Sequence, residues 1–81
     1  MAHENELILN IDRLHTTELG VVRIKKNIGL DTEDVVSWCK KQICTPACNI
    51  TRRGKNWYAK VGDAVITVNA HSFTIITAHK T

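Results

Sequence analysis

The sequence contains no apolar stretch long enough to cross a membrane, and its first residues do not form a secretory signal. The opening residues, MAHENELILN, place acidic side chains before the apolar ones and have no cationic segment ahead of them. A secretory signal needs a cationic segment followed by an apolar one. We therefore expect a cytoplasmic protein that has no membrane partner.

Motifs that would identify a nucleotide-binding or metal-dependent enzyme are also absent. The sequence has no GxxxxGK loop ending in Ser or Thr, no GxGxxG turn and no HExxH site. Its three cysteines have spacings that match neither a CxxC ribbon nor a common zinc pattern. Small buried hydrophobes in a reducing compartment are the best explanation for Cys39, Cys44 and Cys48. The sequence thus predicts no metal and no cofactor.

Acidic residues are scarce in the C-terminal part of the chain. The net charge is +3, and residues 49–81 contain a single acid, Asp63. The basic residues of this part are Arg52, Arg53, Lys55, Lys60 and Lys80. A positive field of this kind attracts phosphate groups or an acidic protein partner. The alternative is a solvated basic surface without a specific ligand.

A chain of 81 residues is long enough for one domain with one core, so we expect residues 1–81 to form a single domain. Its helical part is predicted at about residues 4–44. The first helix, at 4–14, has these apolar residues at helical spacing: Leu7, Ile8, Ile11 and Leu14. The pattern predicts an amphipathic helix.

Two further helices are predicted from caps and apolar spacing. The second begins at Thr16 or Thr17 and ends at Gly29, which suits a helix C-terminus. Its apolar side consists of Leu19, Val21, Ile24 and Ile28. The third begins at residue 31 or 32 and ends before Pro46, because proline cannot continue a helix. Its buried side consists of Val35, Trp38, Cys39 and Ile43.

The sheet part is predicted at about residues 47–80, as short strands separated by turn residues. The strands are expected at 49–52, 57–61, 64–69 and 73–78. Connections this short permit only hairpins, so three to four strands form an antiparallel meander. The predicted fold is α+β, with two to three N-terminal helices packed on one face of the sheet.

The final hairpin allows its two faces to be assigned. If Val68 pairs with Phe73, alternation places one set of residues on the core face: Ala64, Ile66, Val68, Phe73 and Ile75. The other face then carries Val65, Thr67, Asn69, Thr74, Ile76 and Lys80. This open face is rich in hydroxyl and amide groups, with basic groups at its rim. A slip of one residue would exchange the two faces.

The turn at residues 52–55 is a candidate for binding phosphate. Arg52, Arg53 and Lys55 surround its glycine, beside two aromatic residues. Tyr58 is the candidate for stacking on a base, because Trp57 alternates with apolar residues and is expected in the core. Hydrogen bonds to phosphate or sugar oxygens are expected from Thr67 and Asn69. The alternative for the cations is a solvated hairpin tip.

Residues 74–80 read TIITAHK, a strand pattern that runs into His79 and Lys80. Histidine titrates near neutral pH and can act as a general base or acid, so His79 is a candidate catalytic residue. His15, at the junction of the first two helices, is a candidate second partner in proton transfer. The alternatives are a frayed C-terminal tail for His79 and a packing or capping role for His15.

Four segments carry a resemblance to a known family: LHTTELGVVRIKKNIGL (14–30), VVSWCKKQI (35–43), RRGKNWY (52–58) and ITVNAHSFTIITAHK (66–80). Together they resemble a family of short bacterial and archaeal proteins known only as a domain of unknown function. The likeness spans nearly the whole chain. It implies a shared fold but no activity.

A more distant likeness joins the helices, the meander and the TIITAHK strand to the barnase, colicin and toxin-type RNase superfold. That resemblance implies phosphate binding by Arg52, Arg53 and Lys55, and a hydroxyl from Thr77 near the scissile group. His79 and Lys80 would lie at the strand tip, although the family pattern has an aromatic or small residue where His79 stands. Cleavage of RNA without a metal requires a base, a cation and an acid at one phosphate. We therefore expect the turn cations and the end of the chain to meet around one anion-sized site.

Three functions compete on this basis. The first is a small RNA-binding protein, with metal-independent endoribonuclease activity of the toxin type as its catalytic form. The second is a non-enzymatic phage or mobile-element protein that inhibits a host nuclease or defence complex, so its partner would be a protein; an antitoxin would be the partner of a toxin. The third is a winged-helix DNA binder in which the helix after residue 31 reads DNA and residues 53–55 form the wing.

Overall fold

Helices precede strands along the chain in the computed structural model, which describes residues 6–29 and 34–80. The helices are α1 (Glu6–Leu9), the 3-10 turn η1 (Ile11–Arg13), α2 (Glu18–Ile28) and α3 (Val35–Ile43). The strands are β1 (Asn49–Arg53), β2 (Asn56–Val61), β3 (Ala64–Asn69) and β4 (Ile75–Lys80). The predicted α+β fold is confirmed.

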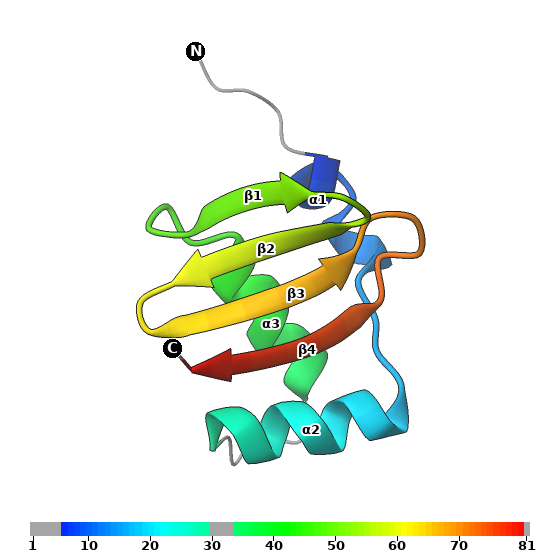
Figure 1. The fold of residues 1–81 in the computed structure, drawn as a ribbon, viewed down its shortest axis with the longest axis vertical. Helices are drawn as coiled ribbons and strands as arrows, with labels where there is room; N and C mark the ends of the chain where they lie inside the picture. The colour runs from blue at the N-terminus through cyan, green and yellow to red at the C-terminus, as the bar shows by residue number, and fades with distance from the viewer. Residues whose placement is uncertain (1–5, 30–33, 81) are drawn as a thin grey trace.

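The four strands form one antiparallel sheet in the order β1-β2-β3-β4, which is the predicted meander (Figure 1). Two-residue turns join β1 to β2 and β2 to β3, and each turn begins with a glycine. Gly54 and Gly62 both have a φ of 58°, the left-handed region that a type II′ hairpin turn needs at this position. Side chains other than glycine adopt this conformation at a cost, so the sequence places glycine where the chain reverses.

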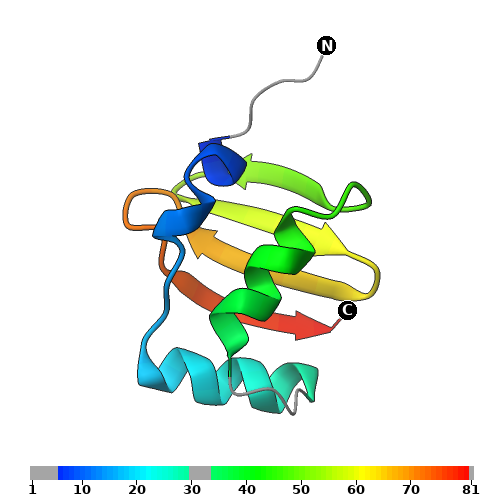
Figure 2. The same ribbon diagram turned by 180° about the vertical axis from the view of Figure 1, so that it is seen from behind.

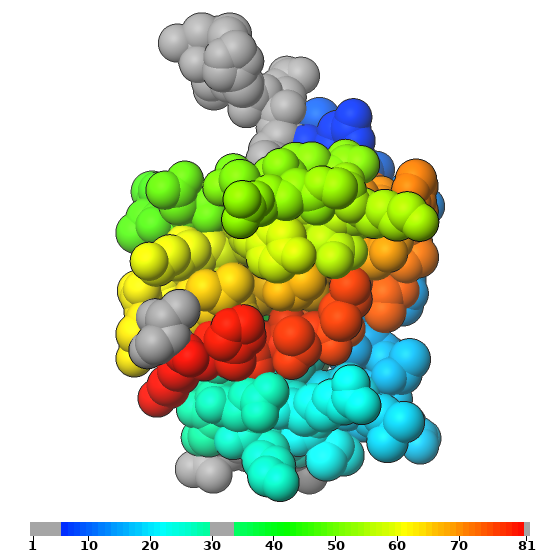
Figure 3. Space-filling view, viewed as in Figure 1, coloured from blue at the N-terminus to red at the C-terminus, as the bar shows by residue number. Residues whose placement is uncertain are grey.

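One face of the sheet is covered by helices and the other is not. Figure 2, which views the molecule from behind, shows α3 crossing in front of the sheet, while α2 lies along the free edge of β4 in both views. The core between them consists of Leu7, Leu14, Ile24, Ile28, Val35, Cys39, Ile43, Trp57, Ala59, Ala64, Ile66, Val68, Phe73, Ile75 and Ala78. Figure 3 shows the opposite face, where the four strands themselves form the surface.

The single helix predicted at 4–14 is wrong, because the chain forms α1 and η1 with a break at Asn10. The Asn10 amide donates to the carbonyl of Glu6 and so ends the first turn. Leu7 and Leu14 are buried as predicted, but Ile8 is 42% exposed. Two short pieces at different angles can bury both leucines without keeping every apolar residue on one stripe.

The boundaries predicted for α2 agree with the structure. Thr17 caps its start by accepting a hydrogen bond from the amide of Gly20, and Gly29 ends it in a left-handed conformation. Leu19, predicted on the apolar side, is 71% exposed. The helix instead turns Gly20, Ile24 and Ile28 inward.

The third helix buries the predicted residues Val35, Cys39 and Ile43. Its cap is Asp34, whose carboxylate accepts from the amide of Ser37 at 2.9 Å. That hydrogen bond lowers the pKa of Asp34. The start predicted at Asp31 or Thr32 lies outside the described residues.

Strand β4 contains a β-bulge opposite β3. Val68 lies opposite Ile75, but the next residue of β3, Thr67, lies opposite Thr77, so Ile76 is an extra residue. Ile76 is 40% exposed. The bulge changes the alternation of the rest of the strand.

The end of β4 is consequently reversed from the prediction. His79 lies opposite Val65 on the uncovered face, whereas Lys80 lies opposite Ala64, which is buried on the covered side. The prediction that Lys80 shares the open face is wrong, because an inserted residue exchanges the faces. The predicted pairing of Val68 with Phe73 is also wrong, although Phe73 is buried as expected.

Candidate functional site

The uncovered face of the sheet is organised in three rows that run across the strands. The first row consists of Arg53, Asn56, Asn69, Thr74 and His15. The second consists of Thr51, Tyr58, Thr67 and Thr77. The third consists of Asn49, Lys60, Val65 and His79. Side chains directly opposite one another on neighbouring strands point to the same face, so these residues share one surface.

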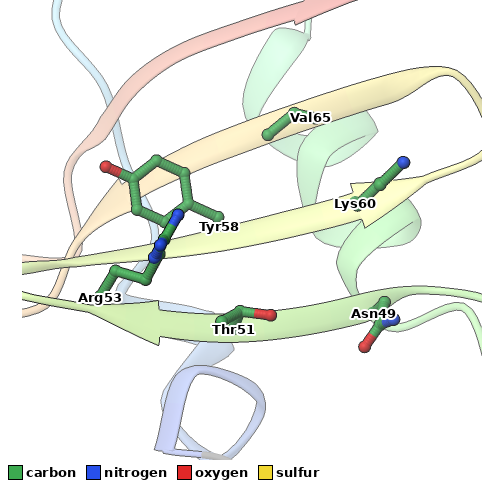
Figure 4. Close-up of a pocket in the computed structure, with 6 residues that line it drawn as sticks. All are labelled: Asn49, Thr51, Arg53, Tyr58, Lys60 and Val65. Atoms are coloured by element: carbon green, nitrogen blue, oxygen red, sulfur yellow. The ribbon is translucent and has the colours of Figure 1, made fainter. Parts of the chain in front are cut away.

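A shallow hollow of about 470 Å³ lies on the β1 side of this face. It is lined by Asn49, Thr51, Arg53, Tyr58, Lys60 and Val65. Figure 4 shows the ring of Tyr58 and the side chain of Arg53 at one end of the hollow and Lys60 at the other. Tyr58 is half-buried.

Two cations lie at opposite ends of the hollow. Arg53 lies opposite Asn56, and Lys60 follows Asn56 by four residues on β2, which puts the two cations about 13 Å apart along the strands at about 3.3 Å per residue. The three rows contain no Asp or Glu among the residues that the structure describes. The hollow is therefore positive, with an aromatic group beside Arg53 at one end.

His15 extends the first row beyond β4. The segment around His15 pairs in parallel with Thr74: its amide donates to the carbonyl of Phe73, and its carbonyl accepts from the amide of Ile75. The hydroxyl of Thr16 also donates to the carbonyl of Ile75 at 2.8 Å. These bonds close the β4 edge at this end of the sheet.

The imidazole of His15 is oriented by two hydrogen bonds. Its Nδ1 lies 2.8 Å from the carbonyl oxygen of Arg13, which can only accept, so Nδ1 carries the proton. In the neutral ring, Nε2 then accepts from the hydroxyl of Thr74 at 3.0 Å. The Thr74 hydroxyl also contacts the hydroxyl of Ser72 at 2.7 Å. This arrangement can pass a proton along the edge of the face.

Asn69 shapes the loop between β3 and β4. Its Oδ1 accepts from the amides of His71 and Ser72 at 2.9 and 3.0 Å. The loop ends at Phe73, whose φ of 59° costs about 1–2 kcal/mol for a residue with a side chain. Packing of its ring against Trp57, with centroids 5.2 Å apart, offsets that cost. The oxygen of Asn69 thus holds the loop, and its predicted binding of nucleic acid stays a prediction.

Several predicted site residues do share the uncovered face. They are Arg53, Tyr58, Thr67, Asn69, Thr77, His79 and His15. Thr77 receives a hydrogen bond at 3.4 Å from the amide of Asn27 on α2, so its hydroxyl is already engaged. Thr67 is only 7% exposed, because it lies between Tyr58 and Thr77.

Arg52 and Lys55 lie elsewhere. The guanidinium of Arg52 is 5.5 Å from the centroid of the Trp57 ring, and its Nε donates to the carbonyl of Gly54. Arg52 thus belongs to the side of the sheet that faces the core. Lys55 is exposed at the tip of the turn.

The prediction that the turn cations and the end of the chain meet at one anion-sized site is wrong. Arg53 and His79 are in different rows, about 13 Å apart along the strands and about 14 Å across three strand spacings. His15 and His79 are also separated, because the row of His15 and Thr74 and the row of His79 are about 13 Å apart along the strands. Antiparallel strands put the β1–β2 turn and the end of β4 at opposite ends of the sheet.

Sequence reasoning missed Lys60 and the two β1 residues of the hollow, Asn49 and Thr51. A signal was present, because Tyr58 and Lys60 alternate with the buried residues Trp57 and Ala59. That alternation places Lys60 beside Tyr58 on the same face. The contribution of β1 required the strand register.

The cysteines are free and differ in environment. Cys39 is fully buried, and burial raises its pKa to about 12. Cys44 is exposed, and Cys48 is half-buried with a raised pKa caused first by burial. No group of three or more His, Cys, Asp and Glu side chains in the described residues is arranged to hold a metal ion.

Comparison with known proteins gives one match. A family model described as "Protein of unknown function (DUF3781)" matches residues 8–79. No curated protein and no solved structure matches the chain. Within the described residues, no helix is long and apolar enough to span a membrane.

Proposed function

The chain belongs to the DUF3781 family, whose description assigns no activity, and we propose that its uncovered sheet face binds single-stranded RNA. Tyr58 stacks on an unpaired base, and Arg53 and Lys60 bind phosphates on either side of it. The predicted membership of a family of unknown function is confirmed. The likeness to the barnase-type superfold remains a prediction.

One observation carries the proposal: an aromatic ring in a hollow that has a cation at each end, on the sheet face that no helix of the described residues covers. Base stacking on an aromatic side chain contributes about 1–3 kcal/mol per base and tolerates any sequence. Lys and Arg supply the salt-dependent attraction to phosphate. A base inside a duplex is stacked on both faces by its neighbours and offers no free ring face, so this arrangement favours single strands over duplexes.

The polar groups around the hollow suit a ribose as well as a phosphate. Thr51 and Asn49 on β1 and Asn56 on β2 present hydroxyl and amide groups on the same face. Such groups donate to phosphate oxygens and exchange hydrogen bonds with a 2′-hydroxyl. A 2′-hydroxyl is the feature that distinguishes RNA from DNA at a given site, so we expect weaker binding of the DNA strand of the same sequence.

Binding is better supported than cleavage. Cleavage without a metal needs a base and an acid on opposite sides of one phosphate, and His15 and His79 lie too far apart to serve the same one. The endoribonuclease activity expected from the RNase likeness therefore has no assembled site in this geometry.

The test is fluorescence anisotropy with a labelled single-stranded RNA of mixed sequence. Tyr58→Ala should weaken binding by about fivefold to a hundredfold, the effect of losing one base–aromatic stack. Tyr58→Phe keeps the ring and should bind within about twofold of the wild type. Arg23→Ala, which removes an exposed cation from α2, is the control for loss of charge.

Equal affinity of the wild type and Tyr58→Ala would contradict the proposal and leave the protein-partner alternative. The same RNA incubated in EDTA provides a separate readout for cleavage. Intact RNA would agree with the separated histidines. Cleavage that is lost in both His15→Gln and His79→Gln would show that the two residues do act together.

A further inference from the structure

The outer edge of β1 is the open edge of the sheet in the part of the chain that the structure describes. The opposite edge is closed, because α2 and the His15–Thr16 segment lie against β4. Figure 1 shows β1 as the outermost strand, with α1 at its end. An open edge presents unpaired backbone groups that can pair with another strand.

The register shows which backbone groups point outward. Arg53 and Asn56 flank the two-residue turn and so exchange hydrogen bonds with each other, and the pattern then alternates along the strand. Asn49, Thr51 and Arg53 therefore bond to β2. The amides and carbonyls of Ile50 and Arg52 point away from the sheet.

We propose that two copies of the chain pair antiparallel through β1, with Thr51 on the twofold axis, to form one eight-stranded sheet. In this register Ile50 exchanges both hydrogen bonds with Arg52 of the second copy, and the reverse pair does the same. The outward-pointing backbone amides and carbonyls of Ile50 and Arg52 are thus all hydrogen-bonded in both copies. The pairing does not depend on RNA binding.

The side chains of NITRR are complementary in this register. Arg53 lies opposite Asn49 of the second copy, Arg52 lies opposite Ile50, and Thr51 lies opposite itself. No arginine faces an arginine directly, although like charges opposite one another would oppose pairing. A shift that centres the axis on Arg52 would place the two Arg52 side chains face to face.

The arginines do not block the edge. Charged side chains on an edge strand commonly prevent such pairing. Arg52 is instead drawn over its own Trp57 ring and bonded to the Gly54 carbonyl, and Arg53 faces the hollow. The small Thr51 at the centre leaves the strands free to approach. The α1 helix at the same edge adds two exposed apolar side chains, with Ile8 at 42% and Leu9 at 62%.

Pairing would join the two hollows into one surface. Each hollow is lined by three β1 residues, Asn49, Thr51 and Arg53, and these would adjoin the same residues of the second copy. The combined face would carry two Tyr58 rings and four cations.

Sedimentation equilibrium of four samples tests the proposal: the wild type, Thr51→Lys, Thr51→Glu and an equimolar mixture of the two variants. Each variant alone places like charges on the axis and should raise the dimer dissociation constant by about fivefold or more. The mixture places opposite charges there and should form a heterodimer at least as stable as the wild-type dimer. Thermal unfolding of dilute monomers checks that both variants fold, since Thr51 is exposed.

A wild type that remains monomeric up to about 1 mM would overturn the proposal. So would variants that dimerise like the wild type, or a mixture that associates no better than its components. Amide hydrogen exchange gives a residue-level check. The amides of Ile50 and Arg52 should become protected as the protein concentration rises, while that of Thr51, bonded within the chain, should not change.

Discussion

At the scale of single residues, His15 shows how backbone position decides what a side chain can do. Its two ring nitrogens are both engaged, one with the Arg13 carbonyl and one with the Thr74 hydroxyl. A sequence shows a histidine between two helices and cannot show these partners, because Thr74 is 59 residues away. The expected packing role and the expected proton-transfer role are thus both compatible with the orientation found.

The cysteines support a prediction at the same scale. Cys39 should resist alkylation at pH 8 in the folded protein, whereas exposed Cys44 should react rapidly. The thiolate is the reactive form, and burial raises the pKa of Cys39 from 9.0 to about 12. Mass spectrometry of iodoacetamide-treated protein, before and after addition of denaturant, would measure both rates. Rapid labelling of Cys39 under native conditions would contradict the buried position.

The sign of the pH effect follows from the same shift. A raised pKa means that the folded state retains the thiol proton when the unfolded chain has lost it. The contribution of Cys39 to stability is therefore complete below pH 9 and is lost as the pH rises toward 12.

At the scale of secondary-structure elements, the strands were easier to predict than the faces of the last one. All four strands were expected within about two residues of their observed bounds, because Gly54 and Gly62 mark the turns and apolar residues alternate between them. The bulge at Ile76 could not be predicted. Nothing in TIITAHK distinguishes a regular strand from one with an extra residue, and a single insertion reverses every later side chain.

The helices show a similar limit. Caps at Thr17 and Gly29 fixed α2 correctly, since their chemistry is local. The inward face of α2 depended on packing against β4 and Thr16, so spacing alone placed Leu19 in the core incorrectly.

Gly20 provides a prediction for how α2 is seated. Alanine favours helices over glycine by about 1 kcal/mol, yet Gly20→Ala should destabilise the protein by about 1–3 kcal/mol. The new Cβ would collide with the hydroxyl of Thr16, which is held by its hydrogen bond to the Ile75 carbonyl. Urea unfolding of Gly20→Ala would measure the loss.

Thr16→Ala is the partner variant for a double-mutant cycle. Removing the hydroxyl removes the collision, so Gly20→Ala should cost much less in a Thr16→Ala background. Equal costs in both backgrounds would show that Thr16 does not restrict the position.

At the scale of the whole molecule, the distribution of charge matters more than the net charge of +3. The sequence showed that the sheet part is basic, and the fold then divides its cations between two sides. Arg53 and Lys60 face the hollow, whereas Arg52 and Lys80 do not. The proposed site therefore offers fewer cations for phosphate than the composition suggests.

The salt dependence of RNA binding would measure how many cations of the proposed site contact phosphate. With two phosphate contacts per chain, a plot of log K against log salt concentration should have a slope of about −1.4 for a single strand. Arg53→Ala should reduce the slope to about −0.7, and Arg23→Ala should leave it unchanged. Anisotropy titrations between low and moderate salt would give the three slopes, and a value unaffected by Arg53→Ala would remove Arg53 from the interface.

The expectation that the 52–55 turn and the end of β4 meet at one site is wrong, and the reason lies in the topology of the whole sheet. Local patterns correctly predicted the meander. A meander also determines the end of the sheet at which each turn lies. Three strands, an odd number, lie between the β1–β2 turn and the end of β4, so the two groups are at opposite ends of the sheet, and that geometry was implicit in the predicted topology.

The bridge between His15 and Thr74 also bears on the order in which the protein assembles. Hairpins join neighbouring strands and can close as soon as both strands exist. This bridge spans 59 residues, and closing so long a loop costs more conformational entropy. During synthesis His15 leaves the ribosome 59 residues before Thr74. The segment that seals the β4 edge has therefore to wait, unpaired, until the first three strands and Thr74 have been made.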